Sequence, residues 1–338
     1  WNIDYSDTEA LSDLVEKEGF DYLVPGCTDR SYKSCAIVSQ GRFPGIESPD
    51  IEHGMHNKEK FRAIAEKLNL PIPETQNHNS KSLDYPVIIK PVDSFSGRGI
   101  TVIKNRNKKL LDSAIELARK NSAAEEYLLE KFISGELYSH SAFLKNKTAI
   151  KNFFVKEDST VNSFVVDTSR VIFSPPPEMQ RQIINAVEKL ARYLRLKDGL
   201  IHWQFIWDGC NIYLIDINRR IAGDLYSQLI ELSTGYPYVE NYVRPFLGMS
   251  YKNIEDNDTR MPIMRHTVSV SKEQNFNHIS FKESLFLESW VALSSAGDQI
   301  KASPDGSVGI LFARANSQAD LLSLYEATIR RQLYEVVG

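Results

Sequence analysis

The chain has 338 residues, of which 42% are hydrophobic and 25% are charged, and its formal net charge is -4. These values are ordinary for a soluble globular protein with two or three subdomains. The slightly negative charge argues against nucleic acid as the main partner, and no apolar run reaches the length of a membrane span. Cys27, Cys35 and Cys210 lack metal-ligand spacing and are odd in number, so we expect free thiols in a reducing cytoplasm. Because the first residue is Trp rather than Met, we expect the natural start to lie upstream.

Residues 1–54 are predicted to form part of a small open α/β domain whose first part lies upstream. Ser6, followed three residues later by Glu9, has the pattern of a capping box at the start of a helix. A short buried strand over residues 20–24 and a helix over residues 30–40 follow. This alternation predicts a βα unit of a parallel sheet.

The stretch over residues 87–103 carries the first pattern that suggests chemistry. An apolar strand ends on Lys90, a loop rich in Ser and Gly follows, and a second strand resumes at Ile100. Backbone N–H groups approach phosphate oxygens only where side chains do not block them, and a lysine at the strand end can lie beside the same phosphates. A surface turn is the commoner explanation of such a stretch taken alone, so the rest of the chain must decide.

The regular elements around this stretch follow from hydrophobic periodicity. A helix opens at Asn57 and Lys58, and three prolines, residues 175–177, introduce a long amphipathic helix. The other expected elements are a helix over residues 110–118 and strands over residues 126–133, 137–144, 148–155 and 161–173.

Residues 200–220 predict a β-hairpin of two alternating strands. If residues 209–211 form its loop, Asp208 lies opposite Ile212, whereas a two-residue loop would break this register. The core face of the hairpin would then carry Trp203, Phe205, Trp207, Tyr213, Ile215 and Ile217.

The same register places polar side chains together on the other face of the hairpin. Gln204 lies opposite Asp216, and His202 lies opposite Asn218. We expect His202 and His140 to be packing residues rather than catalytic bases.

The rest of the chain is predicted to alternate helices and strands. Helices are expected over residues 223–234 and 237–247, a linker over 251–260, strands over 264–270, 284–293 and 308–313, and a final helix over 319–334.

In combination, these motifs resemble the ATP-grasp superfamily, in particular its carboxylate–amine ligases. The resemblance covers roughly residues 55–250 and lies in the order of three segments, VIIKP with the following GRGI, LEKFI, and IDINRR. It implies an α/β (α+β) ATP-grasp fold, with the partial open α/β domain before it and a C-terminal mixed β/α subdomain over residues 251–338. A P-loop is excluded because the chain contains no GxxxxGK[ST] motif.

The resemblance also implies ATP and Mg²⁺ (or Mn²⁺) as cofactors and assigns roles to residues of this chain. Phosphate binding would fall to Lys58, Lys90, Ser94, Ser96, Gly97, Arg98 and Gly99. The adenine hinge would be Glu130, Lys131, Phe132 and Ile133. The metal ligands would be Gln204, Asp216 and Asn218. Arg220 and Lys90 would be the catalytic cations. Apart from the resemblance, a helix expected to start at Gly223 would expose free N–H groups beside Arg220, so we expect the substrate at Arg220, Gly223 and Asp224.

Two positions depart from the family pattern. Gln204 stands where many relatives have a metal-binding carboxylate, so the site carries one less negative charge. Leu137 stands where the ribose-binding glutamate is expected, so either Glu136 takes that role or ribose recognition lies elsewhere. Asp224 also allows two interpretations, a cap of the helix expected from Gly223 or a contact with an incoming ammonium group.

The implied activity is an ADP-forming ligation of a small-molecule carboxylate to an amine through an acyl phosphate. Alternatives are a ligase that uses bicarbonate, formate or a nitrogen other than that of an amino acid, and a catalytically lapsed ATP-binding regulatory protein. We expect no nucleic-acid or membrane partner, and a homodimer is an open alternative for the assembly.

Overall fold

The structure is a computed structural model that describes residues 1–80, 82–94, 97–252 and 259–338. Its centre is an eight-stranded sheet in the order β12-β14-β9-β6-β5-β4-β7-β8, in which all neighbouring strands are antiparallel. The predicted mixed α/β class is therefore confirmed. The strands of this sheet are β4 (Glu136–Lys145), β5 (Thr148–Asp158), β6 (Thr168–Val171), β7 (Gly199–Trp207), β8 (Ile212–Asn218), β9 (Ile263–Val268), β12 (Phe286–Ala292) and β14 (Gly309–Arg314).

Helices cover both faces of this sheet. One face packs against α3 (Pro49–His56), α4 (Lys58–Lys67) and α6 (Pro177–Tyr193), with Phe61 edge-on to Trp203 at a ring separation of 5.8 Å. The other face packs against α1 (Thr8–Glu18), α2 (Asp29–Ser39), α7 (Tyr226–Thr234), α8 (Tyr238–Val243) and the 3₁₀ helix η1 (Arg244–Leu247).

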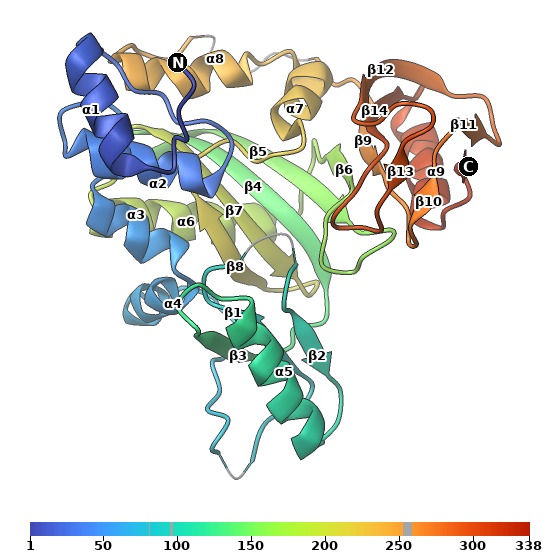
Figure 1. Cartoon of the computed structure of the whole chain (residues 1–338), viewed down its shortest axis with the longest axis horizontal. Coiled ribbons are helices and arrows are strands. Elements are labelled where there is room, and N and C mark those ends of the chain that lie inside the picture. The colour runs from blue at the N-terminus through green and yellow to red at the C-terminus, as the bar shows by residue number, and fades with distance from the viewer. Residues whose placement is uncertain (81, 95–96, 253–258) are drawn as a thin grey trace.

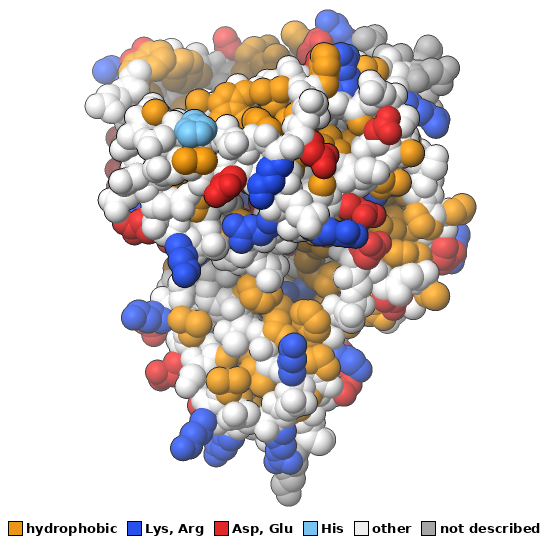
Figure 2. Space-filling model, turned by 90° about the vertical axis from the view of Figure 1, so that its right-hand side faces the viewer, with side chains coloured by type: hydrophobic (Ala, Val, Ile, Leu, Met, Phe, Trp, Pro, Cys, Tyr) orange, Lys and Arg blue, Asp and Glu red, His pale blue; other side chains and the backbone are white. Residues whose placement is uncertain are grey.

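A small lobe hangs below the main sheet (Figure 1). It consists of a sheet in the order β2-β1-β3 and one covering helix, namely β1 (Val87–Pro91), β2 (Thr101–Ile103), β3 (Tyr127–Lys131) and α5 (Lys108–Lys120). Figure 2 shows the molecule hollowed where this lobe meets the main body, with Lys and Arg side chains along the upper margin of the hollow.

The N-terminal part differs from its prediction in two respects. Asp7, not Ser6, caps α1 by accepting a hydrogen bond from Ala10 N, because the Ser6 hydroxyl is already bonded to Asp4. The strand expected over residues 20–24 is wrong, since this segment lies in no strand and exposes Tyr22 by 52%. A strand needs a hydrogen-bonded neighbour, and the described residues offer none here, so the βα interpretation is wrong as well.

The β7–β8 hairpin has the predicted register at its far end but not at its loop. His202 pairs with Asn218 and Gln204 with Asp216, as predicted. At the loop, however, Trp207 rather than Asp208 lies opposite its predicted neighbour Ile212. The loop is one residue longer than expected, and a β-bulge beyond Gln204 absorbs the extra residue.

The bulge also changes which residues of β8 face the core. Ile212 and Leu214 are fully buried, whereas Tyr213 and Ile215, which were predicted to be buried, are only partly so. Ile217, beyond the bulge, is buried as predicted.

The C-terminal strands extend the main sheet through the pairing of β9 with β6. The β structure predicted over residues 161–173 is thus limited to β6, and the predicted final helix is shorter, since α9 (Gln318–Ile329) gives way to strand β15 (Tyr334–Val337). The remaining short strands are β10 (Gln274–Asn275), β11 (His278–Phe281) and β13 (Gln299–Ile300).

Part of the predicted linker, residues 253–258, lies outside the described residues. No helix in the described ranges is both long and apolar enough to cross a membrane.

Candidate functional site

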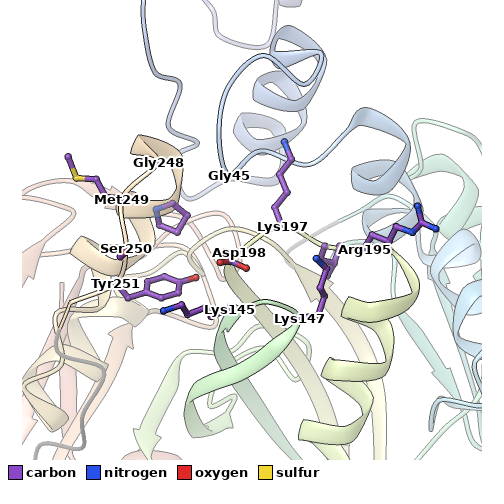
Figure 3. A pocket seen from close by; sticks show the side chains of 12 residues that line it. Gly45, Lys145, Lys147, Arg195, Lys197, Asp198, Gly248, Met249, Ser250 and Tyr251 are labelled. Atoms are coloured by element: carbon purple, nitrogen blue, oxygen red, sulfur yellow. The ribbon is translucent and has the colours of Figure 1, made fainter.

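A basic hollow of about 440 Å³ lies at the end of the sheet near the β4–β5 turn, and the predicted site residues do not line it. Lys145, Lys147, Arg195 and Lys197 surround it, together with Asp198. Figure 3 shows these cationic side chains spread in different directions, with Arg195 turned away from the others. The hollow is therefore not the centre on which the sequence motifs converge.

The motifs converge instead on the junction between the small lobe and the main sheet. Lys90 lies near the end of β1, and its Nζ is 2.6 Å from Glu130 Oε2 on the neighbouring strand β3. Arg62 of α4 donates from Nε to the other oxygen of Glu130 at 2.5 Å and from Nη2 to the carbonyl of Ile215 at 3.2 Å. One arginine thus joins the lysine of the lobe to strand β8 of the main sheet.

Lys90, Glu130 and Arg62 form a buried triad, and burial shifts the pKa values within it. It lowers the pKa of the Lys90 ammonium to about 8, against the opposing effect of Glu130. Burial would raise the pKa of Glu130, but Lys90 and Arg62 together hold it below its ordinary value. Glu130 therefore serves as the counter-ion of both cations, and its expected contact with adenine stays a prediction.

The second predicted lysine lies beside the Gly-rich loop. Lys58 begins α4, and its Nζ donates to the carbonyl of Ser94 at 3.1 Å. Gly97 and Gly99 have φ angles of 68° and 73°, and an added Cβ at Gly97 would lie 2.7 Å from Phe164. The loop therefore needs glycine for both its conformation and its close packing.

The same loop is also tied to the C-terminal part of the chain. Arg98 forms an ion pair of 2.9 Å with Asp305, while the Ser94 hydroxyl donates to the carbonyl of Arg98. Ser96, another predicted phosphate ligand, lies outside the described residues.

The remaining hinge residues lie at the end of β3 and directly after it. Lys131 is paired with Asp84 at the surface. Phe132 donates its backbone N–H to the carbonyl of Pro86 at 2.8 Å, and it is half-buried, as is Ile133. Glu136 is exposed and accepts a hydrogen bond from the Tyr138 hydroxyl at 2.9 Å. The roles of these residues toward adenine and ribose stay predictions.

The three predicted metal ligands lie on one face of the β7–β8 hairpin. Gln204 and Asp216 are cross-strand partners and partly exposed, and Asn218 is buried two residues beyond Asp216. When its amide nitrogen faces Asp29 and His56, Asn218 donates to Asp29 Oδ1 at 2.6 Å and to His56 Nε2 at 2.9 Å. Its oxygen then occupies the end of the amide that lies 3.4 Å from Asp216 Oδ2.

Two oxygens this close to each other suit a cation between them. No three His, Cys, Asp or Glu side chains within the described part of the chain form a ready-made metal site. Mg²⁺ needs few protein ligands because it keeps several waters and binds substrate phosphates. The donor set of Asp216, Asn218 and Gln204 therefore fits Mg²⁺ that is bound together with a nucleotide.

Both histidines of this region behave as packing residues. Burial lowers the pKa of His202 to about 3 and that of His140 to about 4, so both rings are neutral near pH 7. His202 Nδ1 is hydrogen-bonded to the Ser141 hydroxyl at 2.9 Å.

The predicted substrate residues are differently arranged from the expectation. Arg220 Nε donates to Asp29 Oδ1 at 2.6 Å, and the arginine side chain remains 14% exposed. The helix expected from Gly223 begins at Tyr226, after Leu225 in a left-handed conformation, because Asp224 and Leu225 both have positive φ. Gly223 is therefore not at a helix N-terminus, and the capping role considered for Asp224 is wrong.

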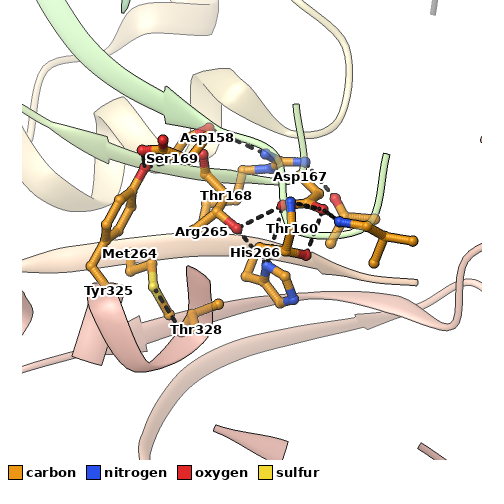
Figure 4. Close-up of polar contacts among 12 residues, drawn as sticks. Asp158, Thr160, Asp167, Thr168, Ser169, Met264, Arg265, His266, Tyr325 and Thr328 are labelled. Atoms are coloured by element: carbon orange, nitrogen blue, oxygen red, sulfur yellow. Dashed lines mark hydrogen bonds and ion pairs between the residues drawn. The ribbon is translucent and has the colours of Figure 1, made fainter. Parts of the chain in front are cut away.

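Asp224 pairs instead with a buried arginine that the sequence reasoning missed. Arg265 Nη2 lies 3.0 Å from Asp224 Oδ2, and Arg265 Nε donates to the Asp224 carbonyl at 2.7 Å. Figure 4 shows Arg265 beside Ser169, within the polar contacts that link β6, β9 and α9. A single arginine in a predicted strand gives no signal of its own, since only the β6–β9 pairing brings it to the site.

Glu157 is the second residue that the sequence reasoning missed. It is buried on β5, accepts a hydrogen bond from Gln204 Nε2 at 2.8 Å, and has its pKa raised by burial to about 7. The signal was its alternation with the buried Phe153 and Val155, which places its side chain on the same face as theirs.

Comparisons with known proteins identify the domain that contains most of these motifs. Residues 83–228 match the ATP-grasp domain family. Over 238 residues, covering 67% of this chain, the sequence is 23% identical to the carbamoyl phosphate synthase large chain of Clostridium acetobutylicum, and the match spans only 21% of that relative's length.

Two solved structures share the fold over nearly the whole chain. An L-amino acid ligase from Bacillus licheniformis superposes with a TM-score of 0.78 and 18% identity, covering 98% of this chain and 86% of that one. The biotin carboxylase domain of 2-oxoglutarate carboxylase from Hydrogenobacter thermophilus, in complex with MgADP, ADP and bicarbonate, gives a TM-score of 0.71 and 18% identity, covering 99% and 78%. The chain therefore has the ATP-grasp fold, and residues 83–228 within it match the ATP-grasp domain.

Proposed function

We propose that this protein is an ATP-dependent, ADP-forming ligase that joins a small-molecule carboxylate to an amine. The observation that carries the proposal is Arg62, which holds Glu130 and its partner Lys90 on one side and strand β8 with Asp216 on the other. A phosphate-binding lysine and a metal-binding carboxylate are thereby fixed relative to each other, as phosphoryl transfer requires. The MgADP complex of the Hydrogenobacter protein supports the choice of nucleotide and metal.

In this proposal, Lys58, Lys90 and the Gly-rich loop bind the phosphates of ATP. Asp216, Asn218 and Gln204 would hold Mg²⁺, which would neutralise charge on the phosphates. Catalysis then depends on position and charge rather than on a protein nucleophile, and this fits the neutral, hydrogen-bonded state of His202.

The reaction proceeds in two balanced steps. A carboxylate oxygen of the first substrate attacks the γ-phosphorus, the bond to ADP breaks, and an acyl phosphate forms. The amine nitrogen then attacks the acyl carbon, phosphate leaves, and the nitrogen loses a proton to give the amide. Arg220 and Arg265 supply positive charge for the carboxylate and its acyl phosphate, and Asp224 offers a carboxylate to an incoming ammonium.

The direct test is phosphate release from ATP with pooled carboxylates crossed with pooled amines, with bicarbonate and formate among the carboxylates. We expect ADP and phosphate only when both substrate classes are present. For a positive pair, ¹⁸O placed in the carboxylate must appear in the released phosphate, whereas label found only in the product would overturn the acyl-phosphate step.

A second candidate is a regulatory protein that binds ATP without turnover. The neutral Gln204 at a metal-binding position favours it, because fewer negative charges weaken metal affinity. Tight binding of MgATP without ADP formation against any pool would support this candidate over the ligase.

A further inference from the structure

Gln204 raises a question of orientation that a carboxylate at the same position would not raise. The two ends of an amide differ chemically, because the oxygen attracts a cation while the NH₂ group repels it. A glutamine can therefore serve as a metal ligand only if something else holds its nitrogen away from the metal.

The structure contains a group that does this. Glu157 is only 4% exposed, and its Oε2 accepts a hydrogen bond from Gln204 Nε2 at 2.8 Å. Glu157 Oε2 is the acceptor in this contact, so the nitrogen end of the amide is the end that faces Glu157. Gln204 Oε1 is consequently turned away from Glu157, on a side chain that is partly exposed and paired across the hairpin with Asp216.

The backbone makes this contact possible across an intervening strand. Glu157 lies on β5 and Gln204 on β7, while β4 runs between them and places Ser139 opposite Gln204. The Ser139 hydroxyl lies 2.9 Å from the Tyr226 hydroxyl and is also hydrogen-bonded to Glu157, so β4 helps to hold the acceptor in place.

We propose that Glu157 is a positioning residue that selects the orientation of the Gln204 amide and thereby makes Gln204 Oε1 a metal ligand. This inference rests on the proposed function, because it assumes a divalent cation at Asp216. It explains how a neutral residue can serve in this chain where the family resemblance leads us to expect a carboxylate.

The test measures Mn²⁺ affinity in the presence of ADP, from the electron paramagnetic resonance signal of free Mn²⁺, and ADP affinity without metal, by calorimetry. E157A removes the acceptor and should weaken Mn²⁺ binding by roughly 10-fold, the size typical of lost outer-shell partners. The double variant E157Q/Q204E exchanges the two groups, so that an amide donates to a carboxylate ligand, and Mn²⁺ affinity should return to within about threefold of wild type. D158N is the matched control, since Asp158 is the next residue of β5 and its side chain instead accepts from the Tyr325 hydroxyl and pairs with Lys156.

The outcomes separate this inference from the proposed function. Wild-type Mn²⁺ affinity in E157A, or a double variant that binds no better than E157A, would overturn the positioning role. A parallel fall in metal-free ADP affinity would indicate general damage to the site and would also overturn it. If E157A fails to fold, E157M, which fills the volume of the glutamate side chain without its acceptor oxygens, decides in its place. Absence of Mn²⁺ binding by the wild-type ADP complex would overturn the metal assignment of the proposed function itself.

Discussion

Replacement of Glu130 by Gln should destabilise the protein strongly at neutral pH. Glu130 is fully buried and is the counter-ion of two cations, Lys90 and Arg62, whose side chains are only 7% and 3% exposed. Glutamine keeps the volume of the side chain but removes the charge, so both cations lose their compensation. Breaking a buried pair in this way costs about 3–5 kcal/mol, a large part of a total stability of about 5–15 kcal/mol.

The cost should depend on pH through Lys90. Its pKa of about 8 in the folded protein lies below the ordinary value of 10.5, so the unfolded chain binds more protons between these pH values. Lys90 is charged below pH 8, where the lost pair is felt in full, and it becomes neutral as the pH rises further. The difference in unfolding free energy between wild type and E130Q should therefore be larger at pH 7 than at pH 9.

Urea unfolding followed by tryptophan fluorescence measures this difference, because Trp203 is buried in the main core. The matched control is D84N, which removes the neighbouring ion pair of Lys131, whose partners are 41% and 57% exposed. Such an exposed pair contributes about 0–1 kcal/mol. The counter-ion role of Glu130 is refuted if E130Q loses no more stability than D84N, or if its loss is the same at pH 7 and pH 9.

Three further predictions concern the proposed ligand contacts. ADP affinity of the wild type should fall as the pH rises through about 8, because Lys90 loses its proton. The K90R variant should bind ADP more weakly than the wild type, but its affinity should not show this fall. Calorimetry across pH 6.5 to 9.5 checks both expectations. D216N should abolish turnover while its thermal unfolding stays close to wild type, since Asp216 is partly exposed on the polar face, and a normal rate would remove it from the metal site. R220K should lower kcat far more than ATP affinity, because the guanidinium fork is lost where charge develops, whereas lost ATP affinity at an unchanged rate would move Arg220 to the nucleotide.

Hydrophobic periodicity predicted the strands that pair with the next strand in the sequence. The strands expected over residues 137–144 and 148–155 correspond to β4 and β5, and Asn146 and Lys147 between them adopt positive φ. The segment over residues 20–24 has the same apolar character, but no strand in the described residues pairs with it, and it stays irregular. Sequence shows what a strand could contain, whereas the partner that satisfies its backbone comes from the tertiary fold.

The candidate site was only partly accessible from sequence for a related reason. Motif residues such as Lys90 and Asp216 lie in recognisable strand ends, and the chain order shows that they belong together. Glu157 and Arg265 enter the site through the β5–β4–β7 and β6–β9 pairings, which join residues far apart in the sequence. Glu130 was recognised, but its role as counter-ion depends on the β1–β3 register.

The bulge in β8 links the register of the hairpin to the geometry of the candidate site. Asp208 accepts hydrogen bonds from the backbone of Cys210 and Asn211, and the resulting loop is one residue longer than the alternation of the strands allows. Without compensation, this extra residue would turn Asp216 to the core face and leave the site without its carboxylate. The bulge restores the pairing with Gln204 by leaving one residue, Ile215, without a cross-strand partner. The carbonyl of that residue accepts the hydrogen bond from Arg62, so the irregularity that corrects the register also fixes β8 to Glu130 of the small lobe.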